Sequence, residues 1–427
     1  PMTMTIANLI AAAQPLQPGL VPIAVEDVRA LRWLAVEPEV TIALHAKLVV
    51  PGTVEVDLPG YARATVRFGK TYPSAPAPQL APLTNARPAP FSAEEMYAGR
   101  WMFHGPEYQG VTGLGPLGDD GVDGEITTLP APGALLDCAG QLMGWWVMHT
   151  EDHDRLAMPV HIERIAFFGQ HPSAGERVAC RVRIREVTEQ NVRADLEVGA
   201  WAQITGWTDR RFDSDAAVWN ILMYPEDNVL AVPDPAGFVT VTEHWRNSSS
   251  RELMMRRYLG EAERADHDRT GPRARRGWLL GRIAIKDAAR LHHAKKMWPA
   301  EIAVSNAPSG QPLVAKLHVS VSHKDDRAVA IVDADRAVGI DLERIEPRTE
   351  SFLAIAFTPA ERAHATTDAA YARLWAAKEA VAKALGTGMT DPKRFEAVPH
   401  GDDLKIADFV VHTKRDGDYM IAWTKAP

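Results

Sequence analysis

Residues 337–345 read AVGIDLERI, and residues 371–389 read YARLWAAKEAVAKALGTGM. The first stretch alternates as a strand does, so Asp341 and Glu343 project to the same face. The second stretch predicts a helix that carries Glu379 and ends at its first glycine. Neighbouring carboxylates repel each other, and hard oxygen ligands of this kind suit Mg2+. Each pattern alone is also compatible with ordinary surface acids.

Two further patterns bear on phosphate chemistry. Lys378 and Lys383 flank Glu379 on the predicted helix, which suits a pyrophosphate but also describes a common surface charge pair. The stretch KLHVSVSHKDD predicts a strand that ends at Ser322 and His323. A hydroxyl and an imidazole at a strand end can hold a phosphate, or they can form local hydrogen bonds to the backbone.

Taken together, VSHKDD, VGIDLE and WAAKEAVAKALG resemble the Sfp-type phosphopantetheinyl transferase family, with FTPAERA in the expected place between them. The resemblance implies an α/β pseudo-twofold fold over residues 246–427, with coenzyme A as substrate and Mg2+ as cofactor. It also implies a serine of an acyl carrier protein as acceptor. One departure is Gln311 in SNAPSGQP, where the family has a basic residue. A metal-dependent hydrolase or a binding module of the same fold stays open as an alternative.

The resemblance assigns roles to individual residues. The implied Mg2+ ligands are Asp341, Glu343 and Glu379, and Glu379 is also the expected proton acceptor for the attacking serine. The implied contacts to coenzyme A phosphates are Ser322, His323, Lys378 and Lys383. Lys383 is also expected to neutralise charge during transfer. Glu361 matches a family acid near the metal, or it is a helix cap.

A basic region precedes these motifs in a chain whose formal net charge is -8. Residues 251–296 contain 13 Lys or Arg against 6 Asp or Glu. Arg282, Lys286 and Arg290 recur every four positions and share one face of a predicted helix. We interpret this stripe as a contact for the 3'-phosphate of coenzyme A or for an acidic carrier protein. A solvated helix face is the alternative.

The first half of the chain carries a second set of motifs, in WMFHGPEYQGV, LPAPGALLDCAGQLMGWW and LAMPVHIERIAFFG. Asp137 and Gln141 are four residues apart on an otherwise apolar helix, so the carboxylate is expected to be desolvated and suited to general acid chemistry. A hydrogen-bonded core aspartate is the alternative. In order, the three strings resemble polyketide synthase dehydratase domains, which have a double hot-dog fold.

This second resemblance implies that Asp137 and Gln141 are catalytic. His104 stands where the family has a tyrosine, and we expect it to be structural or to line the pocket. The family's catalytic histidine belongs to a motif expected just before Pro1, so we predict that this unit, taken as given, does not dehydrate its substrate. His45 lies in a strand and receives no catalytic role. A non-catalytic hot-dog module for dimerisation or acyl holding is the alternative.

Composition limits the remaining possibilities. The acidic net charge argues against a nucleic-acid-binding protein, and no apolar run approaches the ~20 residues of a membrane span. We therefore expect a cytoplasmic protein. Cys138 and Cys180 are the two cysteines, too few for a disulfide framework, and we expect both to be buried as small apolar groups.

These observations predict an α+β protein of four parts. They are the first hot dog at 1–88, the second hot dog at 89–228, a linker at 229–245 and the transferase at 246–427. The combination resembles the end of an iterative type I polyketide synthase of the enediyne kind. The expected partners are an acyl carrier protein and coenzyme A, with neither nucleic acid nor membrane, and a homodimer through the hot-dog domain is possible.

Overall fold

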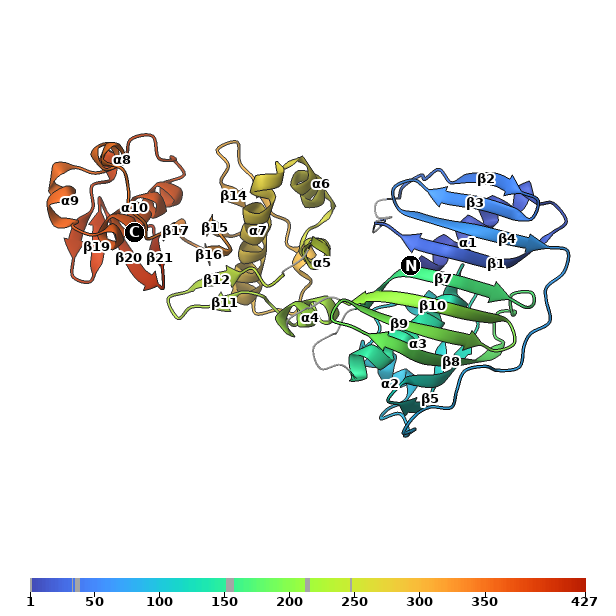
Figure 1. The fold of residues 1–427 in the computed structure, drawn as a ribbon. Helices are drawn as coiled ribbons and strands as arrows, with labels where there is room; N and C mark the ends of the chain where they lie inside the picture. Colours follow the sequence, from blue (N-terminus) through green and yellow to red (C-terminus); the bar gives the residue numbers. More distant parts are fainter. Residues whose placement is uncertain (1, 33, 35–38, 151–156, 212–215, 246–247) are drawn as a thin grey trace. The chain divides into compact units, whose positions relative to one another are not determined.

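The computed structural model describes residues 2–32, 34, 39–150, 157–211, 216–245 and 248–427 (Figure 1). Residues 1–214 and 215–427 form two compact units, called here the N-terminal and the C-terminal unit. Within the described ranges, no helix is long and apolar enough to cross a membrane. The expected transferase start at residue 246 lies outside the described residues.

The N-terminal unit is built twice on one plan, a helix combined with a run of antiparallel strands. Its elements are α1 (Met2–Ala13), β1 (Val21–Ala30), β2 (His45–Val50), β3 (Thr53–Leu58), β4 (Ala62–Gly69), α2 (Ala93–Ala98), β5 (Val111–Gly118), β6 (Gly121–Thr127), α3 (Ala134–Thr150), β7 (Ala157–Phe167), β8 (Arg177–Val187), β9 (Asn191–Val198) and β10 (Ala202–Arg211). One ten-stranded sheet has the order β2-β3-β4-β1-β7-β10-β9-β8-β6-β5. The antiparallel pair of β1 and β7 joins the halves, which confirms the double hot-dog prediction (Figure 1).

Helix α3 is the central helix of the second hot dog. Its apolar residues Leu135, Cys138 and Trp145 are fully buried, as expected for a helix enclosed by a sheet. A Cβ atom on Gly140 would lie 2.8 Å from the Trp207 ring, so this glycine lets α3 approach β10 closely. The close approach fixes the height at which Asp137, one turn earlier, stands over the sheet.

Two larger antiparallel sheets, each packed against one long helix, and a separate two-stranded pair are found in the described residues of the C-terminal unit. Its elements are α4 (Ala216–Met223), β11 (Val232–Pro233), β12 (Phe238–Thr242), α5 (Ser248–Tyr258), α6 (Glu261–Arg269), α7 (Pro272–His293), β13 (Ser305–Asn306), β14 (Pro312–Leu313), β15 (His318–Lys324), β16 (Arg327–Asp333), β17 (Val338–Arg344), α8 (Glu350–Ala356), α9 (Pro359–His364), α10 (Asp368–Leu385), β18 (Val398–His400), β19 (Asp403–Ile406), β20 (Phe409–Asp416) and β21 (Tyr419–Lys425).

The two sheets have the orders β11-β12-β16-β15 and β17-β21-β20-β19-β18. Helix α7 packs on β15 and β16, and α10 packs on β17 and β21, so the halves repeat one plan (Figure 1). They meet where β15 runs beside β17. There the backbone N–H of Ile340 donates to Ser320 Oγ at 3.0 Å. The predicted motifs of β15, β17 and α10 therefore come together at this junction.

The structure corrects the predicted linker at 229–245. These residues form β11 and β12, and β12 pairs with β16 from Phe238↔Ile331 to Thr242↔Arg327. Phe238, Val239 and Val241 are buried, so the segment is an integral strand of the C-terminal unit. Pro233 lies on the short edge strand β11, where it pairs with Val239, and Pro235 lies in the turn before β12, so neither interrupts the ladder between β12 and β16.

Candidate active sites

The candidate site of the C-terminal unit begins with a close contact between β17 and α10. A Cβ atom on Gly339 would stand 1.8 Å from the carbonyl oxygen of Ala380, so only glycine permits this approach. The contact brings Asp341, two residues after the glycine, beside Lys383, about one turn after Ala380. The glycine of the VGIDLE motif thus has a packing role that positions the acid.

Asp341 is the most buried acid of this site, at 4% exposure. Its Oδ1 atom accepts from Lys383 Nζ at 2.7 Å and from Ser322 Oγ at 2.8 Å. Its Oδ2 atom is buried and has no hydrogen-bond partner among the described residues. Three sequence-predicted residues from β15, β17 and α10 therefore meet at one carboxylate that keeps one oxygen unsatisfied.

Glu343 and Glu379 complete the acidic group. Burial raises the pKa of each, and the charge of Asp341 raises both further. Arg348 Nη2 donates to Glu343 Oε2 at 2.6 Å and partly balances it. In the described part of the chain, no three Asp, Glu, His or Cys side chains converge closely enough to hold a metal ion. The three acids are therefore electrostatically coupled while their side chains stay apart.

His323 lies beside this group, against α7. A Cβ atom on Gly277 would come within 2.6 Å of His323 Nδ1, so the helix has a glycine where the imidazole packs. Partial burial lowers the pKa of His323, and the charge of Lys383 lowers it further. The structure thus brings Ser322, His323, Asp341 and Lys383 together, as the motifs predict.

Lys378 does not join this group, which corrects the role predicted for it. Its ammonium is fully buried and donates to Glu361 Oε2 at 2.8 Å, to the Ala356 carbonyl at 2.8 Å and to the Pro392 carbonyl at 3.0 Å. All three of its N–H donors are used inside the unit. Lys378 therefore ties α10 to α8 and α9 and has no donor left for a coenzyme A phosphate.

Glu361, the partner of Lys378, acts as a helix cap. It accepts from the backbone N–H groups of Thr358 and Ala397, both at 2.8 Å. Thr358 Oγ1 in turn accepts from the Glu361 N–H at 3.2 Å, so the two residues form the capping box of α9. Of the two roles that the sequence left open for Glu361, the contacts favour the cap.

The basic stripe of α7 is also corrected. Arg282, Lys286 and Arg290 share one face as predicted, but that face is buried, at 5%, 0% and 4% exposure. Lys286 Nζ donates to Glu263 Oε2 at 2.6 Å and to the Ile302 carbonyl at 2.7 Å. Arg290 Nη1 donates to Asp287 at 3.1 Å. The face is neither a solvated surface nor an open phosphate site, because acids from within the unit pair with it.

Arg282 is the residue of this face nearest to the N-terminus of α7. Its guanidinium stacks on the Trp278 ring at 4.7 Å, contacts Asn306 Oδ1 and lies 3.8 Å from Glu263. Burial lowers the pKa of Arg282, and the charge of Glu263 opposes that effect. Through these contacts Arg282 links α7 to Asn306 of β13.

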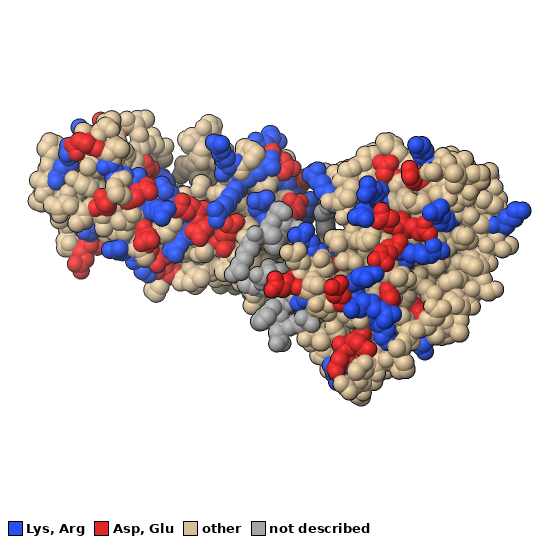
Figure 2. All heavy atoms as spheres, in the orientation of Figure 1, with Lys and Arg blue, Asp and Glu red and all other residues tan. Residues whose placement is uncertain are grey.

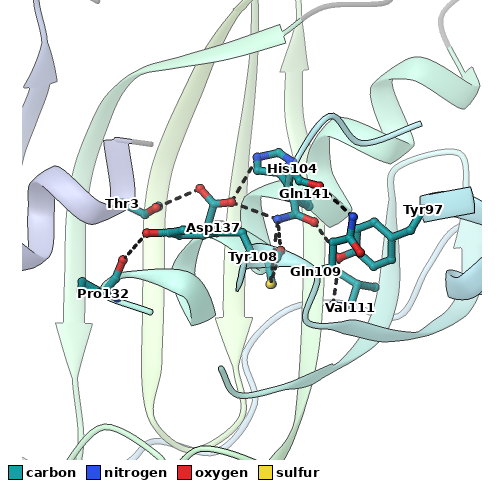
Figure 3. A network of polar contacts seen from close by, with 10 residues as sticks. Thr3, Tyr97, His104, Tyr108, Gln109, Val111, Pro132, Asp137 and Gln141 are labelled. Carbon is teal, nitrogen blue, oxygen red and sulfur yellow. Dashed lines mark hydrogen bonds and ion pairs between the residues drawn. The ribbon is translucent and has the colours of Figure 1, made fainter. Parts of the chain in front are cut away.

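The candidate site of the N-terminal unit is centred on Asp137, at 8% exposure (Figure 3). Asp137 Oδ1 accepts from Thr3 Oγ1 at 2.9 Å, and Oδ2 accepts from Gln141 Nε2 at 3.0 Å. His104 Nε2 lies 3.2 Å from the same Oδ2 atom. Both predicted catalytic residues therefore meet here, joined by a histidine that the sequence assigned to the pocket lining.

Further polar groups extend this network, and sequence reasoning did not find them. Gln141 also donates to the Tyr108 carbonyl at 2.7 Å and accepts from Tyr97 OH at 2.7 Å. Tyr97 lies on α2, and Thr3 lies on α1 of the other hot dog. No local pattern links these positions to Asp137, because the contacts form only when α1, α2 and α3 pack together.

Other residues keep the roles that the sequence suggested. Cys138 and Cys180 are free and buried, and burial raises the pKa of Cys138 to about 12. His45 lies on β2 with a side chain 65% exposed, and its Nδ1 atom is 3.7 Å from Asp57 Oδ2. Asp209 of β10 is an addition. It is buried and accepts from Trp207 Nε1 at 2.7 Å, and burial raises its pKa to about 7.

Two family models match the chain. Residues 75–217 match the polyketide synthase dehydratase N-terminal domain, and residues 337–424 match the 4'-phosphopantetheinyl transferase superfamily. The comparison with curated proteins gives no match. The two matched segments coincide with parts of the N-terminal and the C-terminal unit, apart from residues 215–217 at the boundary.

Solved structures similar to the chain include three dehydratase domains. The domain from the CurF module of curacin polyketide synthase is 20% identical, with a TM-score of 0.39, and the match covers 50% of this chain and 84% of that one. A trans-AT polyketide synthase dehydratase domain from Brevibacillus brevis is 18% identical, with a TM-score of 0.39 and coverage of 50% and 84%. The dehydratase domain of RzxB from Pseudomonas fluorescens is 14% identical, with a TM-score of 0.35 and coverage of 45% and 76%.

Proposed function

Because the chain joins a polyketide synthase dehydratase domain to a domain of the 4'-phosphopantetheinyl transferase superfamily, we propose that its C-terminal unit arms an acyl carrier protein. The unit transfers 4'-phosphopantetheine from coenzyme A to a carrier serine and releases 3',5'-ADP, as a holo-[acyl-carrier-protein] synthase does. The observation that carries this proposal is the buried Asp341, which pairs with Lys383 and keeps a free oxygen beside two more acids.

The proposed reaction is an exchange of bonds at phosphorus. The carrier serine Oγ attacks the β-phosphorus of coenzyme A, and the bond from that phosphorus to the bridging oxygen of 3',5'-ADP breaks. Glu379 accepts the serine proton, which its raised pKa makes easier to hold. Lys383 neutralises charge that develops on the pyrophosphate, and Ser322 and His323 contact its oxygens.

Asp341, Glu343 and Glu379 fit Mg2+ by their donor chemistry. Hard carboxylate oxygens suit this ion, and the unsatisfied Asp341 Oδ2 supplies one of them. When bound, Mg2+ would offset the repulsion among these acids and the charge of the pyrophosphate. Lys383 already supplies one positive charge at Asp341 Oδ1. Arg348 supplies another at Glu343, and the ion would neutralise the negative charge that remains when an anionic substrate binds.

The test is the intact mass of a purified carrier protein after incubation with this chain, Mg2+ and coenzyme A. The proposal expects a carrier heavier by one phosphopantetheine group, together with 3',5'-ADP. Release of 3',5'-ADP without a change in carrier mass would instead identify a hydrolase of the same fold. If neither product forms, the C-terminal unit is a binding module. A carrier with its serine changed to alanine is the matched control.

For the N-terminal unit we propose dehydration of a 3-hydroxyacyl carrier-protein thioester within a polyketide synthase. The buried side chains of Asp137 and Gln141 support this proposal. Burying polar groups on an otherwise apolar helix costs free energy, so such groups are kept where they act on a substrate or fix the packing. The test supplies a 3-hydroxyacyl thioester and follows the 2-enoyl product by mass. For the C-terminal unit, the proposed use of coenzyme A and Mg2+ supports a cytoplasmic location.

A homodimer through the hot-dog unit is a second proposal for this half. Strand β2 is an edge of the ten-stranded sheet, and Leu48, Val49 and Val50 on it are 46%, 47% and 53% exposed. An apolar edge strand readily pairs with another strand. Light scattering should then give twice the chain mass, and Val49→Lys should return it to that of one chain. A monomeric chain would remove this proposal.

A further inference from the structure

Two acids at the candidate site of the C-terminal unit have cations of the chain as partners. Lys383 Nζ lies 2.7 Å from Asp341 Oδ1. Arg348 Nη2 donates to Glu343 Oε2 at 2.6 Å, and Lys324 Nζ stands 4.0 Å from the same oxygen. Three cations of the chain therefore face the three acids of this site.

Lys324 reaches Glu343 because β15 and β17 lie side by side. Ser322 and Lys324 are two residues apart on β15 and project to one side of the strand, as Asp341 and Glu343 do on β17. Ser322 Oγ donates to Asp341 Oδ1 at 2.8 Å, so the next residue on that side, Lys324, comes beside Glu343. The Lys324 side chain is 35% exposed, and an ion pair of this length in contact with water is weak.

Arg348 reaches Glu343 from the segment between β17 and α8. It directly precedes Thr349, whose side chain caps α8 by accepting from the Phe352 N–H at 3.3 Å. The Arg348 side chain is 18% exposed, and that of Glu343 is 14% exposed. A short hydrogen bond between two charged groups at this burial is stronger than the exposed contact of Lys324. Arg348 is therefore the main partner of Glu343.

Arg348 has two further contacts, and neither involves an acid of the site. Its Nη1 atom lies 3.4 Å from Glu346 Oε1, and its guanidinium stacks over the Phe352 ring at 5.4 Å from the ring centroid. Both partners are close to Arg348 in the sequence, so they would keep the guanidinium beside the site if Glu343 turned to another cation. Arg348 can thus give up Glu343 without leaving the site.

We propose that Arg348 exchanges partners during the reaction: it pairs with Glu343 in the free protein and with the pyrophosphate of coenzyme A once Glu343 is bound to Mg2+. This inference rests on the phosphopantetheine transfer proposed above. A guanidinium suits such an exchange, because its planar fork of N–H donors matches a phosphate as well as it matches a carboxylate. Arg348 is then a binding residue for the substrate, and it competes with the metal ion for Glu343 until the substrate arrives.

The exchange keeps the charge of the site balanced. A divalent cation brings as much positive charge as the pyrophosphate of coenzyme A brings negative charge, so neither state leaves a buried ion without a counter-ion. The ion pair also accounts for the separation of the acids in the described residues, since a Glu343 oxygen held by Arg348 is not free to turn toward Asp341. Arg348 would also supply the phosphate contact that Lys378, with all its donors used, cannot supply.

The first test measures Mg2+ binding to the full chain by calorimetry, without coenzyme A. Arg348→Gln removes the competing charge and keeps the Thr349 cap of α8, so it should tighten Mg2+ binding about 10-fold. Lys324→Gln should tighten it less, because the Lys324 contact is longer and more exposed. Arg344→Gln is the matched control. Arg344 is a neighbouring cation that pairs with Asp325 at 3.6 Å, and its loss should change the affinity by less than about twofold.

Two further variants separate competition for Glu343 from an effect on the fold. In a Glu343→Gln background Arg348 has no carboxylate to occupy, so Arg348→Gln should no longer tighten Mg2+ binding. Arg348→Lys keeps the positive charge and should keep the Mg2+ affinity of the wild type within about twofold. A structural role of Arg348 would lower stability in these variants without this pattern of affinities.

The transfer assay tests the second half of the exchange. Arg348→Gln should raise the KM for coenzyme A about 10-fold, because one charge-assisted contact to the pyrophosphate is lost. If the chain transfers phosphopantetheine but Arg348→Gln binds Mg2+ no more tightly than Arg344→Gln, the role of Arg348 is overturned and the transferase stands. Tighter Mg2+ binding with an unchanged KM also overturns that role, since the freed guanidinium would not contact the substrate. A wild type that transfers nothing overturns both proposals.

Discussion

Each unit buries one aspartate at the centre of its site, and the two aspartates are satisfied differently. Asp137, at 8% exposure, has donors at both carboxylate oxygens. Asp341, at 4% exposure, has two donors on Oδ1 and none on Oδ2 among the described residues. Burial alone therefore does not distinguish their tasks, but the number of occupied oxygens does.

This difference in occupied carboxylate oxygens indicates which atom of each site is free to bind a ligand. A carboxylate with a complete set of donors is fixed in place and can orient a neighbour, as Asp137 does for His104. A carboxylate with a free buried oxygen carries a desolvation cost that only a further positive group removes. Under the proposed function, the missing partner of Asp341 would come with the substrate. In the N-terminal unit the atom without a hydrogen-bond partner is not on the aspartate but on His104, at Nδ1.

The strongest test of this comparison removes the incomplete acid. Asp341→Ala should lower phosphopantetheine transfer by roughly 10³-fold, because the charge that organises the pyrophosphate site is lost. The fold should persist, since removing one acid relieves repulsion of Glu343 and Glu379. Intact mass of the carrier measures the transfer. Asp335→Asn, an exposed acid on the turn before β17, is the control, and near-normal transfer by Asp341→Ala at saturating Mg2+ would remove the site.

Substitutions of the two lysines of α10 test whether each one stabilises the fold or binds the substrate. Lys378→Ala should lower the free energy of unfolding of the C-terminal unit by about 3–5 kcal/mol, because Glu361 is left buried without its cation. Lys383→Ala should cost less stability, since its side chain is 28% exposed, but it should stop transfer. Urea unfolding and the KM for coenzyme A separate the two. A stable Lys378→Ala protein with a raised KM would restore the role that the motif suggests.

The contrast between these lysines shows what the sequence could and could not predict. Spacing places Glu379 and Lys383 on one face of α10, and the structure confirms that face. Spacing cannot show that Lys378 points to the Ala356 carbonyl, because that partner comes from another helix. The stripe of Arg282 and Lys286 fails for the same reason. A pattern defines which residues share a face, whereas long-range packing decides whether the face meets water.

The fold was more predictable than the sites, because it depends on repeated local patterns. Alternation indicated β15 and β17, and the three motif strings of the first half indicated a double hot dog. The predicted linker was wrong because Pro233 and Pro235 favour a connector, although Val239 and Val241 lie two residues apart and share one face of a strand. The contacts of Thr3 and Tyr97 at the Asp137 network join distant helices, and no local pattern contains them.

Asp209 extends the comparison to a buried acid with one side-chain donor. Burial raises its pKa to about 7 from an ordinary value of 3.8, so between these values the folded state holds a proton that the unfolded state has lost. Stability of the N-terminal unit should therefore fall as pH rises from about 4 to about 7. Asp209→Asn removes this cost and should stabilise the unit by roughly 2–4 kcal/mol at pH 8, with little effect near pH 4. Thermal unfolding at both values measures it, and an unchanged pH slope in the variant would contradict it.

The smallest expected effect compares one donor at each aspartate. Thr3→Val and Ser322→Ala each remove one hydrogen bond to a carboxylate and should cost about 1–2 kcal/mol in their own unit. Because each substitution destabilises one unit, the melting transition that it lowers belongs to that unit. Mg2+ at about 100 times its Kd should then raise the stability of the C-terminal unit by about 2.7 kcal/mol, in the wild type and in Ser322→Ala. It should leave the Thr3→Val transition unchanged, because Asp137 has donors on both oxygens and Asp341 has one oxygen to offer. If Mg2+ shifted neither transition, the free oxygen of Asp341 would not be a metal ligand, and if it shifted both, the count of occupied oxygens would not distinguish the two sites.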